Sequence, residues 1–366
     1  MTPISRNLAQ CARLIDKRNL KEFSWGIEGA VKILEKGRIP PRTFSGGRVH
    51  QEVEINTVLS KSTYDDLYKE SINFLKNSQQ MDTVEKTMQI EHIAKKWGNK
   101  LNPSNSPDTQ TSLGNSVTNH ISPKSQTCTL KGVEVMSEIM TVYLEILEEA
   151  VKEEKLSSVL LNTNVETFHR LLNACILGWA LVPTTASGMK AQNFLYRMEE
   201  LCNMSPYLAE LTPSAITYGA VLRAWVKSTD TPERNGAVEA RRLLEHQSRI
   251  YSYGVNSKSQ PNMYHYNTLM HGYALRGMVS EAESLLKSLE NKRIYVDSAK
   301  GERLFLSPDV MTYSSCMNVY SKVSERLEGR SAAKRAEDLL YRLYKKYEET
   351  GDKMFMPNQV TFGTGM

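Results

Sequence analysis

The sequence predicts an all-α protein, a right-handed α-solenoid built of stacked antiparallel helix pairs. Two observations lead to this fold class. A short string of residues recurs at regular intervals from Val165 onward. Each copy has an apolar residue followed by Thr and an aromatic residue, or close equivalents of these three residue types. After each complete string, an alanine followed by paired apolar residues recurs with the spacing of one helix face. A lone helix pair cannot bury both of its apolar faces, so we expect neighbouring pairs to stack on a continuous core.

The string marks the first helix of each pair. Its copies occupy 165–172, 215–222, 263–270, 310–317 and 359–363, and the last copy is cut short where the sequence ends at Met366. Four copies follow a proline and a polar residue: Pro213-Ser214, Pro261-Asn262, Pro308-Asp309 and Pro357-Asn358. Proline disfavours helix in the residue before it, and the polar side chain caps the helix that follows. We therefore expect the chain to reverse direction at these four junctions.

The second helix of each pair is marked by an apolar stripe. Its residues are Ala191, Phe194, Leu195 and Met198, then Ala240, Leu243 and Leu244, then Ala282, Leu285, Leu286 and Leu289, then Ala336, Leu339, Leu340 and Leu343. Spacings of three and four residues place these side chains on one face of a helix, and the small alanine lets the first helix approach closely.

Three regions make up the predicted domain organisation. Residues 1–100 carry helical patterns, including 64–75 and 84–97, and the segment Ala30, Ile33 and Leu34 repeats the second-helix signature, which favours degenerate repeats there. Residues 101–130 are rich in Ser, Thr, Asn and Pro, which predicts a disordered linker. Residues 131–366 form the predicted helical repeat array.

Composition and motifs exclude several classes of function. The 366 residues are 40% hydrophobic and 24% charged, and no apolar run is long enough to span a membrane. Five dispersed cysteines show no metal-ligand spacing, and the sequence lacks the hydrolase, metalloprotease, phosphate-binding-loop and deaminase motifs. We expect a protein that is not an enzyme and that holds no cofactor or metal. The net charge of +5 suits a polyanionic partner without requiring one.

The repeated pattern resembles the pentatricopeptide repeat family. The third unit matches best, from Pro261-Asn262 through 266–270 to Gly277, Glu281-Ala282 and Leu285-Leu286. One departure is length, because successive aromatic residues stand about 48 residues apart, which is longer than the family's unit. The extra residues fall at helix junctions, as in 294–307, where insertions are tolerated at a solenoid edge.

The resemblance implies that the array binds single-stranded RNA and reads one base per repeat. In the family, the residue after the aromatic reads the base together with the residue after the next proline. The pairs implied here are His169 with Ser214, Gly219 with Asn262, Asn267 with Asp309, and Ser314 with Asn358. Asn267 with Asp309 resembles the uracil-favouring pair and Ser314 with Asn358 the adenine-favouring pair, whereas the other two pairs depart from the usual types.

The family also uses the residue two places before the aromatic, which sandwiches the base. Ile216, Tyr264 and Met311 occupy this position and suit stacking. Glu166 occupies it in the first unit, where its charge would repel phosphate, so we expect that unit to be structural.

We therefore expect sequence-selective binding of single-stranded RNA, in organellar RNA processing, stability or translation, with other RNA-processing proteins as further candidate partners. Arg6, Arg13, Lys17 and Arg18 are compatible with a mitochondrial or plastid transit segment. The alternative is a protein-binding scaffold of the tetratricopeptide-repeat type, to which His271-Gly272-Tyr273 is a passing match. A positive inner face with polar first-turn residues favours RNA, and an apolar or acidic one favours protein.

Overall fold

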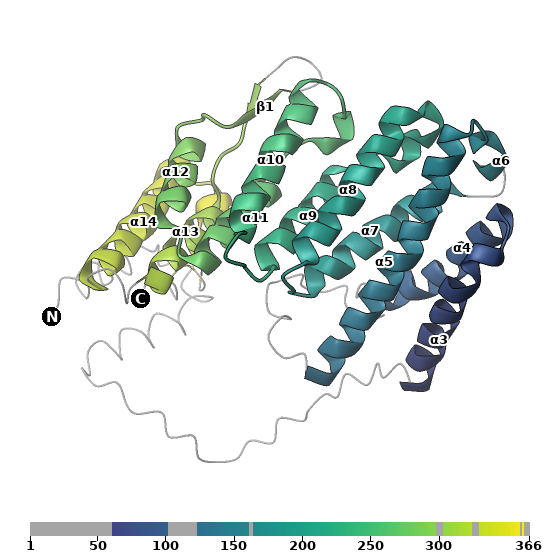
Figure 1. Ribbon diagram of the computed structural model, residues 1–366. Coiled ribbons are helices and arrows are strands. Elements are labelled where there is room, and N and C mark those ends of the chain that lie inside the picture. Colours follow the sequence, from purple (N-terminus) through teal and green to yellow (C-terminus); the bar gives the residue numbers. More distant parts are fainter. Residues whose placement is uncertain are drawn as a thin grey trace, which may run out of the picture.

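Helices stand side by side in sequence order along the molecule (Figure 1). The computed structural model describes residues 61–101, 123–160, 164–297, 303–323, 329–358 and 361. The N-terminal signature around Ala30, the basic segment before it and most of the predicted linker lie outside the described residues.

Four helix pairs coincide with the four complete sequence units. They are α7 (Val165–Leu181) with α8 (Ser187–Met204), α9 (Ala215–Lys227) with α10 (Gly236–Ser252), α11 (Met263–Arg276) with α12 (Val279–Glu290), and α13 (Val310–Val323) with α14 (Gly329–Thr350). Short 3₁₀ turns lie at η4 (Pro206–Leu211), η5 (Ser257–Ser259) and η6 (Lys353–Phe355). The expected all-α repeat fold is confirmed; its right-handed sense stays a prediction.

Further helices precede these four units. They are α3 (Lys61–Asn77), η2 (Ser78–Gln80), α4 (Thr83–Leu101), α5 (Pro123–Lys152) and α6 (Leu156–Leu160). The helices α4 and α5 pack on each other and onto α7, so helical packing continues ahead of Val165. The helix α5 begins at Pro123, inside the segment 101–130 that we expect to be a linker.

The polar residue after each proline caps the helix that follows. The Asn262 side chain accepts a hydrogen bond from the backbone of Tyr264 at 3.0 Å, and the Asp309 carboxylate accepts one from the backbone of Thr312 at 2.9 Å. Such caps satisfy backbone N–H groups that have no partner within the helix. The helix α11 ends at Gly277, whose φ of 63° is favourable for glycine.

The aromatic residues of the first, second and fourth strings pack on the helices before them. Phe168 stacks on Tyr143 of α5, with ring centroids 3.6 Å apart. Tyr218 donates a hydrogen bond to Glu199 of α8, and Tyr313 donates one to Glu290 of α12. These rings are fully buried. The repeated string therefore supplies the contact that joins consecutive units.

The first helices form the more tightly packed layer. α7 packs on α9, α9 on α11 and α11 on α13, whereas the second helices pack chiefly on first helices. Helices that lie closer together occupy the inside of a curve, so we place α7, α9, α11 and α13 on the inner side of the array.

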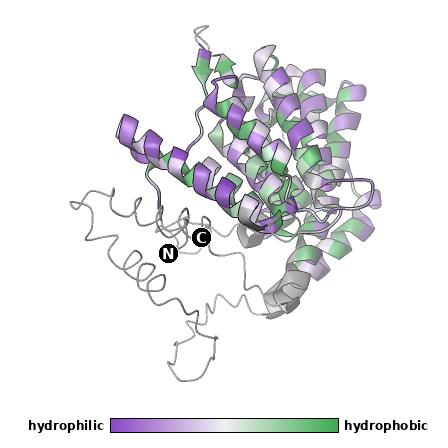
Figure 2. Ribbon diagram, turned by 90° about the vertical axis from the view of Figure 1, so that its left-hand side faces the viewer, coloured by the Kyte–Doolittle hydropathy of each residue, from purple (hydrophilic) through white to green (hydrophobic). Residues whose placement is uncertain are grey.

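A small hairpin interrupts the helices between α12 and α13. Strand β1 (Tyr295–Asp297) pairs antiparallel with β2 (Arg303–Phe305), within the insertion at 294–307. Figure 2, which views the molecule from the α14 end, shows the two strand arrows standing beyond the helices. Successive side chains of a strand point to opposite faces. Tyr295 of β1 and its partner Phe305 of β2 therefore lie on one face of the hairpin, and Val296 lies on the other.

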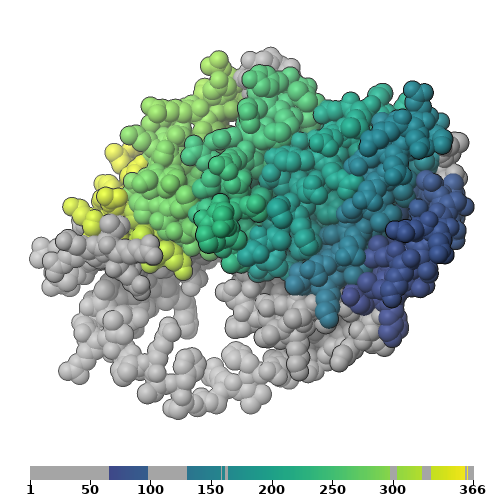
Figure 3. Space-filling view, viewed as in Figure 1, coloured from purple at the N-terminus to yellow at the C-terminus, as the bar shows by residue number. Residues whose placement is uncertain are grey.

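The described units contact their neighbours in sequence order, as the colour gradient in Figure 3 shows. One continuous hydrophobic core runs through them, from Leu67 in α3 to Leu343 in α14. Stability of such an array is the sum of repeat and junction contributions.

Candidate nucleic-acid interface

On three of the inner helices, one face carries the expected stacking and base-reading residues. On α9 it carries Ile216, Gly219, Arg223 and Lys227; on α11, Tyr264, Asn267, His271 and Leu275; on α13, Met311, Ser314, Asn318 and Lys322. Steps of three and four residues place each set on one face of its helix. We call these twelve residues the inner stripe.

The first residues of the inner stripe are apolar and exposed. Ile216 is 74% exposed, Tyr264 54% and Met311 39%. Exposed apolar side chains at equivalent places on three neighbouring helices provide surfaces on which flat rings can stack. This exposure is compatible with the base-stacking role expected for them, which stays a prediction.

The structure brings Asn267 and Asp309 together. The Asn267 side-chain amide donates to both carboxylate oxygens of Asp309, at 3.1 and 3.0 Å. The Thr312 hydroxyl lies 2.6 Å from the Asn267 carbonyl oxygen and 2.9 Å from Asp309 Oδ1. Both side chains are half-buried. The amide and the carboxylate are therefore fixed side by side at the junction between the third and fourth units.

The pair His169 and Ser214 is arranged differently. The His169 ring contacts the backbone carbonyl of Glu210, and Ser214 forms a capping box with Thr217. Thr217 in turn donates to the Asn173 side chain at 2.7 Å. Asn173, one helical turn beyond His169, is thus the α7 side chain connected to this junction, and sequence reasoning missed it.

At the second unit Tyr264 covers the expected reading position. A Cβ atom added to Gly219 would lie 2.9 Å from Cε1 of Tyr264, so a side chain there would displace the ring. Asn262, the other member of the pair, is exposed and caps α11. The tyrosine therefore fills space that a larger residue at 219 would use.

Ser314 and Asn358 make separate local hydrogen bonds. The buried Ser314 hydroxyl donates to the Val310 carbonyl at 2.7 Å, within its own helix. Asn358 accepts a hydrogen bond from the backbone of Thr361 at 3.0 Å. Reading a base through Ser314 would require its hydroxyl to turn away from Val310.

A basic cluster completes the inner stripe. Burial, with the nearby charge of Arg223, lowers the pKa of Lys227. Burial, together with the positive charges of Lys227, Arg223 and Arg276, lowers the pKa of His271. Arg223 and Lys227 lie one helical turn apart on α9, and their positive charges act on His271 of α11. Within the described part of the chain, neither Arg223 nor Lys227 forms an ion pair, so the cluster favours an anionic partner.

Sequence reasoning also missed Arg223 and Lys227. The signal was present, because they follow Gly219 at steps of four residues and so share its helix face. They lie beyond the repeated string, in a part of the helix where the units differ from one another.

No group of three or more His, Cys, Asp or Glu side chains in the described ranges is arranged to hold a metal ion. No helix among them has the length and apolar character needed to cross a membrane.

Stacked helix pairs with an ordered inner face define an α-helical repeat protein. Its third pair is similar to the PPR repeat: the family model of that repeat matches residues 258–290, which include α11 and α12. The match confirms the pentatricopeptide resemblance and indicates an RNA-binding repeat protein. Comparison of the sequence with curated proteins finds no match.

Proposed function

We propose that the inner stripe binds single-stranded RNA. The observation that carries the proposal is the hydrogen-bonded pair of Asn267 and Asp309, which joins two helices whose first turns expose Tyr264 and Met311. A base held between Tyr264 and Met311 would present its edge to an amide and a carboxylate, which supply a donor and an acceptor. The family's pairing leads us to assign uracil to this unit.

Arg223 and Lys227 serve a different purpose in this proposal. They contact phosphates without reading sequence, as basic side chains in nucleic-acid interfaces generally do. The charges of Arg223 and Lys227, unpaired within the described residues, support RNA over the protein-binding alternative. The exposed apolar residues of the first turns, Ile216, Tyr264 and Met311, take the base-stacking role in this proposal. We further propose that the chain acts in a mitochondrion or plastid and affects RNA processing, stability or translation by occupying its target. The basic residues from Arg6 to Arg18 support this location.

A salt titration with a randomised single-stranded RNA pool tests the proposal. Phosphate contacts release counterions, so affinity falls with salt, by about 0.7 logarithmic units per tenfold rise in salt for each contact. The double variant Arg223→Ala with Lys227→Ala should bind less tightly and show a shallower salt dependence. The matched control, Arg242→Ala with Lys287→Ala, removes two exposed charges from second helices and should behave as the unaltered protein. Salt-insensitive binding, or no binding to the pool, would contradict the proposal.

A further inference from the structure

The second helices are joined by a repeated ion pair. Arg197 of α8 reaches Glu148 of α5 at 2.7 Å, His246 of α10 lies 3.1 Å from Glu199 of α8, and Arg342 of α14 contacts Glu290 of α12. The basic members Arg197, His246 and Arg342 stand six residues after the buried alanine of their helices, Ala191, Ala240 and Ala336. The acidic members Glu199 of α8 and Glu290 of α12 stand eight residues after the buried alanines of those helices, Ala191 and Ala282.

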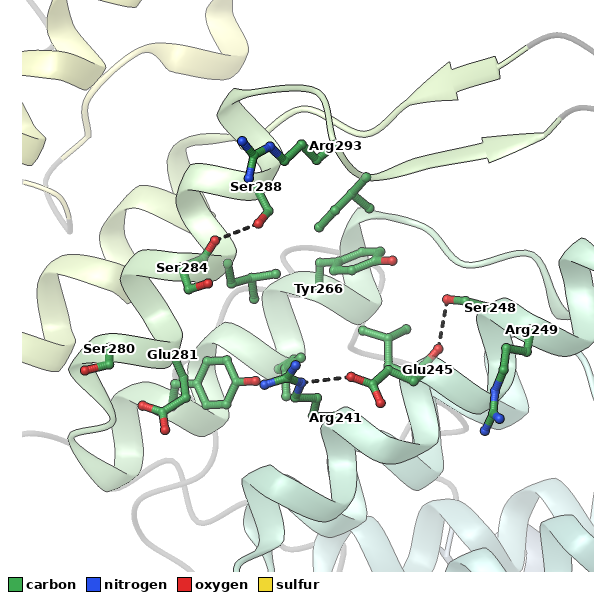
Figure 4. A pocket seen from close by; sticks show the side chains of 15 residues that line it. Arg241, Glu245, Ser248, Arg249, Tyr266, Ser280, Glu281, Ser284, Ser288 and Arg293 are labelled. Atoms are coloured by element: carbon green, nitrogen blue, oxygen red, sulfur yellow. Dashed lines mark hydrogen bonds and ion pairs between the residues drawn. The ribbon is translucent and has the colours of Figure 1, made fainter.

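The ion pair is missing at one junction, between α10 and α12. Ser248 occupies the acidic position and Ser288 the basic position. Their hydroxyls donate within their own helices, to Leu244 and Ser284, and do not join the two helices. A groove of about 870 Å³ opens here and is lined by both serines. We call it the outer groove (Figure 4).

The floor of the outer groove is largely apolar. Leu244 of α10, Leu285 of α12 and Leu269 of α11 line it, with the ring of Tyr266 between them. Tyr266 lies two residues after Tyr264, about 200° around the helix. The groove therefore opens on the side of α11 opposite the inner stripe.

Charges around the outer groove are separated by sign. Arg293 lies toward the hairpin, Arg249 lies on the α10 side of the groove, and Glu281 lies at the end away from the hairpin (Figure 4). In the middle, Arg241 is neutralised by Glu245 at 2.9 Å. Neither Arg249 nor Arg293 has an acidic side chain paired with it in the described ranges. A ligand that fits must bring a negative charge to the hairpin end.

We propose that the outer groove binds a short peptide segment of a partner protein, with leucine-like side chains on the floor and an acidic residue against Arg293 at the hairpin end. Along α10 the groove runs from Arg241 to Arg249, about 12 Å, which accommodates two helical turns or about four extended residues. Glu281, which has no ion pair in the described ranges, disfavours a phosphate backbone at its end of the groove, so a peptide fits better than RNA. The site is separate from the inner stripe, so it is tested independently of RNA binding.

The test is selection of displayed random twelve-residue peptides on the full chain, with counter-selection on Ser248→Glu combined with Ser288→Arg. That double variant installs the ion pair of the other junctions and closes the outer groove without removing core residues. We expect enrichment of peptides that combine leucine-like residues with an Asp or Glu at one end. Arg249→Glu with Arg293→Glu should weaken their binding at least tenfold. The control Lys287→Glu with Lys334→Glu makes the same charge change outside the groove and should leave binding intact.

Three results would overturn the proposal. One is selection that enriches no such peptide. Another is equal binding by the variant with the closed groove, whose folding is checked by its circular dichroism and melting temperature. The third is loss of single-stranded RNA affinity in Arg249→Glu with Arg293→Glu while peptide binding persists, because the groove would then be an RNA contact.

Discussion

Arg276, the last residue of α11, holds the carboxylate of Asp230 from the unit before it, with nitrogen–oxygen distances of 2.8 to 3.0 Å. The same guanidinium donates to the backbone carbonyls of Val226 and Ser228. Burial alone would raise the pKa of Asp230, but hydrogen bonds from Arg276 and the Gly236 backbone, with the charge of Arg276, lower it. One side chain thus fixes the loop between α9 and α10 to the next unit.

Replacing this arginine should weaken the array. Arg276→Ala removes the guanidinium that donates to the Asp230 carboxylate and to two backbone carbonyls, and leaves Asp230 only the Gly236 N–H. We expect a loss of about 2 kcal/mol in the free energy of unfolding. Arg276→Lys should recover part of the loss, because an ammonium group cannot reach all of these oxygens. Urea unfolding measures the effect. Arg242→Ala, which breaks an exposed pair with Glu239, should change stability by less than about 0.5 kcal/mol and serves as control.

Asp309→Asn should change the preferred base at the third unit. Asparagine also caps helices, so the start of α13 should persist. The carboxylate acceptor that faces Asn267 becomes an amide, however, which alters what a base edge can donate or accept. Sequencing of RNA selected by the two proteins should show altered preference at one position and unchanged preference elsewhere. Asp338→Asn on the exposed side of α14 is the matched control; an unaltered preference in Asp309→Asn would count against this pair as the reader.

Acidification should destabilise the fold through His265. Burial lowers the pKa of this histidine below its ordinary value of 6.5, against the opposing effect of hydrogen bonds with Ala215 and Asn262. The unfolded chain therefore binds the proton more readily. This contribution to stability is complete above pH 6.5 and is lost as the pH falls below it. The pKa of His271 is lowered in the same direction.

Urea midpoints at pH 7.5 and pH 5.5 measure this effect. The unaltered protein should lose more stability between the two pH values than His265→Gln, and the variant that also carries His271→Gln should lose least. Equal pH dependence in all three proteins would show that neither histidine is responsible.

Gly236→Ala should destabilise the second unit. A Cβ atom at this position would lie 2.2 Å from the Trp225 carbonyl oxygen, which belongs to the backbone and cannot turn aside. We expect a loss of about 1 to 3 kcal/mol. Gly254→Ala, which meets open space but has a φ of 71°, isolates the backbone cost and should lose about 1 kcal/mol. Thermal melts that rank Gly254→Ala below Gly236→Ala in stability would contradict the clash.

The sequence predicted the repeated helix pairs well because local signals determine them. Proline followed by a cap marks each first helix, and the buried alanines mark each second helix. Asn267 and Asp309 were likewise predictable, since both belong to the repeating pattern. The hairpin was not, because its strands have only three residues each and show no clear alternation.

Other site features depend on contacts between units. The position of Tyr264 over Gly219 and the link from Thr217 to Asn173 join residues that lie far apart in the chain. No short-range pattern encodes them. Arg223 and Lys227 were identified as candidate RNA-binding residues only from the structure, which places them on the inner side of α9.

The two serines at positions 248 and 288 also bear on how the chain folds. In a linear array, cooperativity passes from one unit to the next through their shared interface. The interface between α10 and α12 lacks the ion pair found at the junctions on either side of it, which makes it the weakest coupling along the outer layer. The second and third units are then held together mainly by the packing of α9 on α11 and by the bond of Arg276 to Asp230. We therefore expect Arg276→Ala, unlike the unaltered protein, to unfold as two cooperative blocks that separate at this junction.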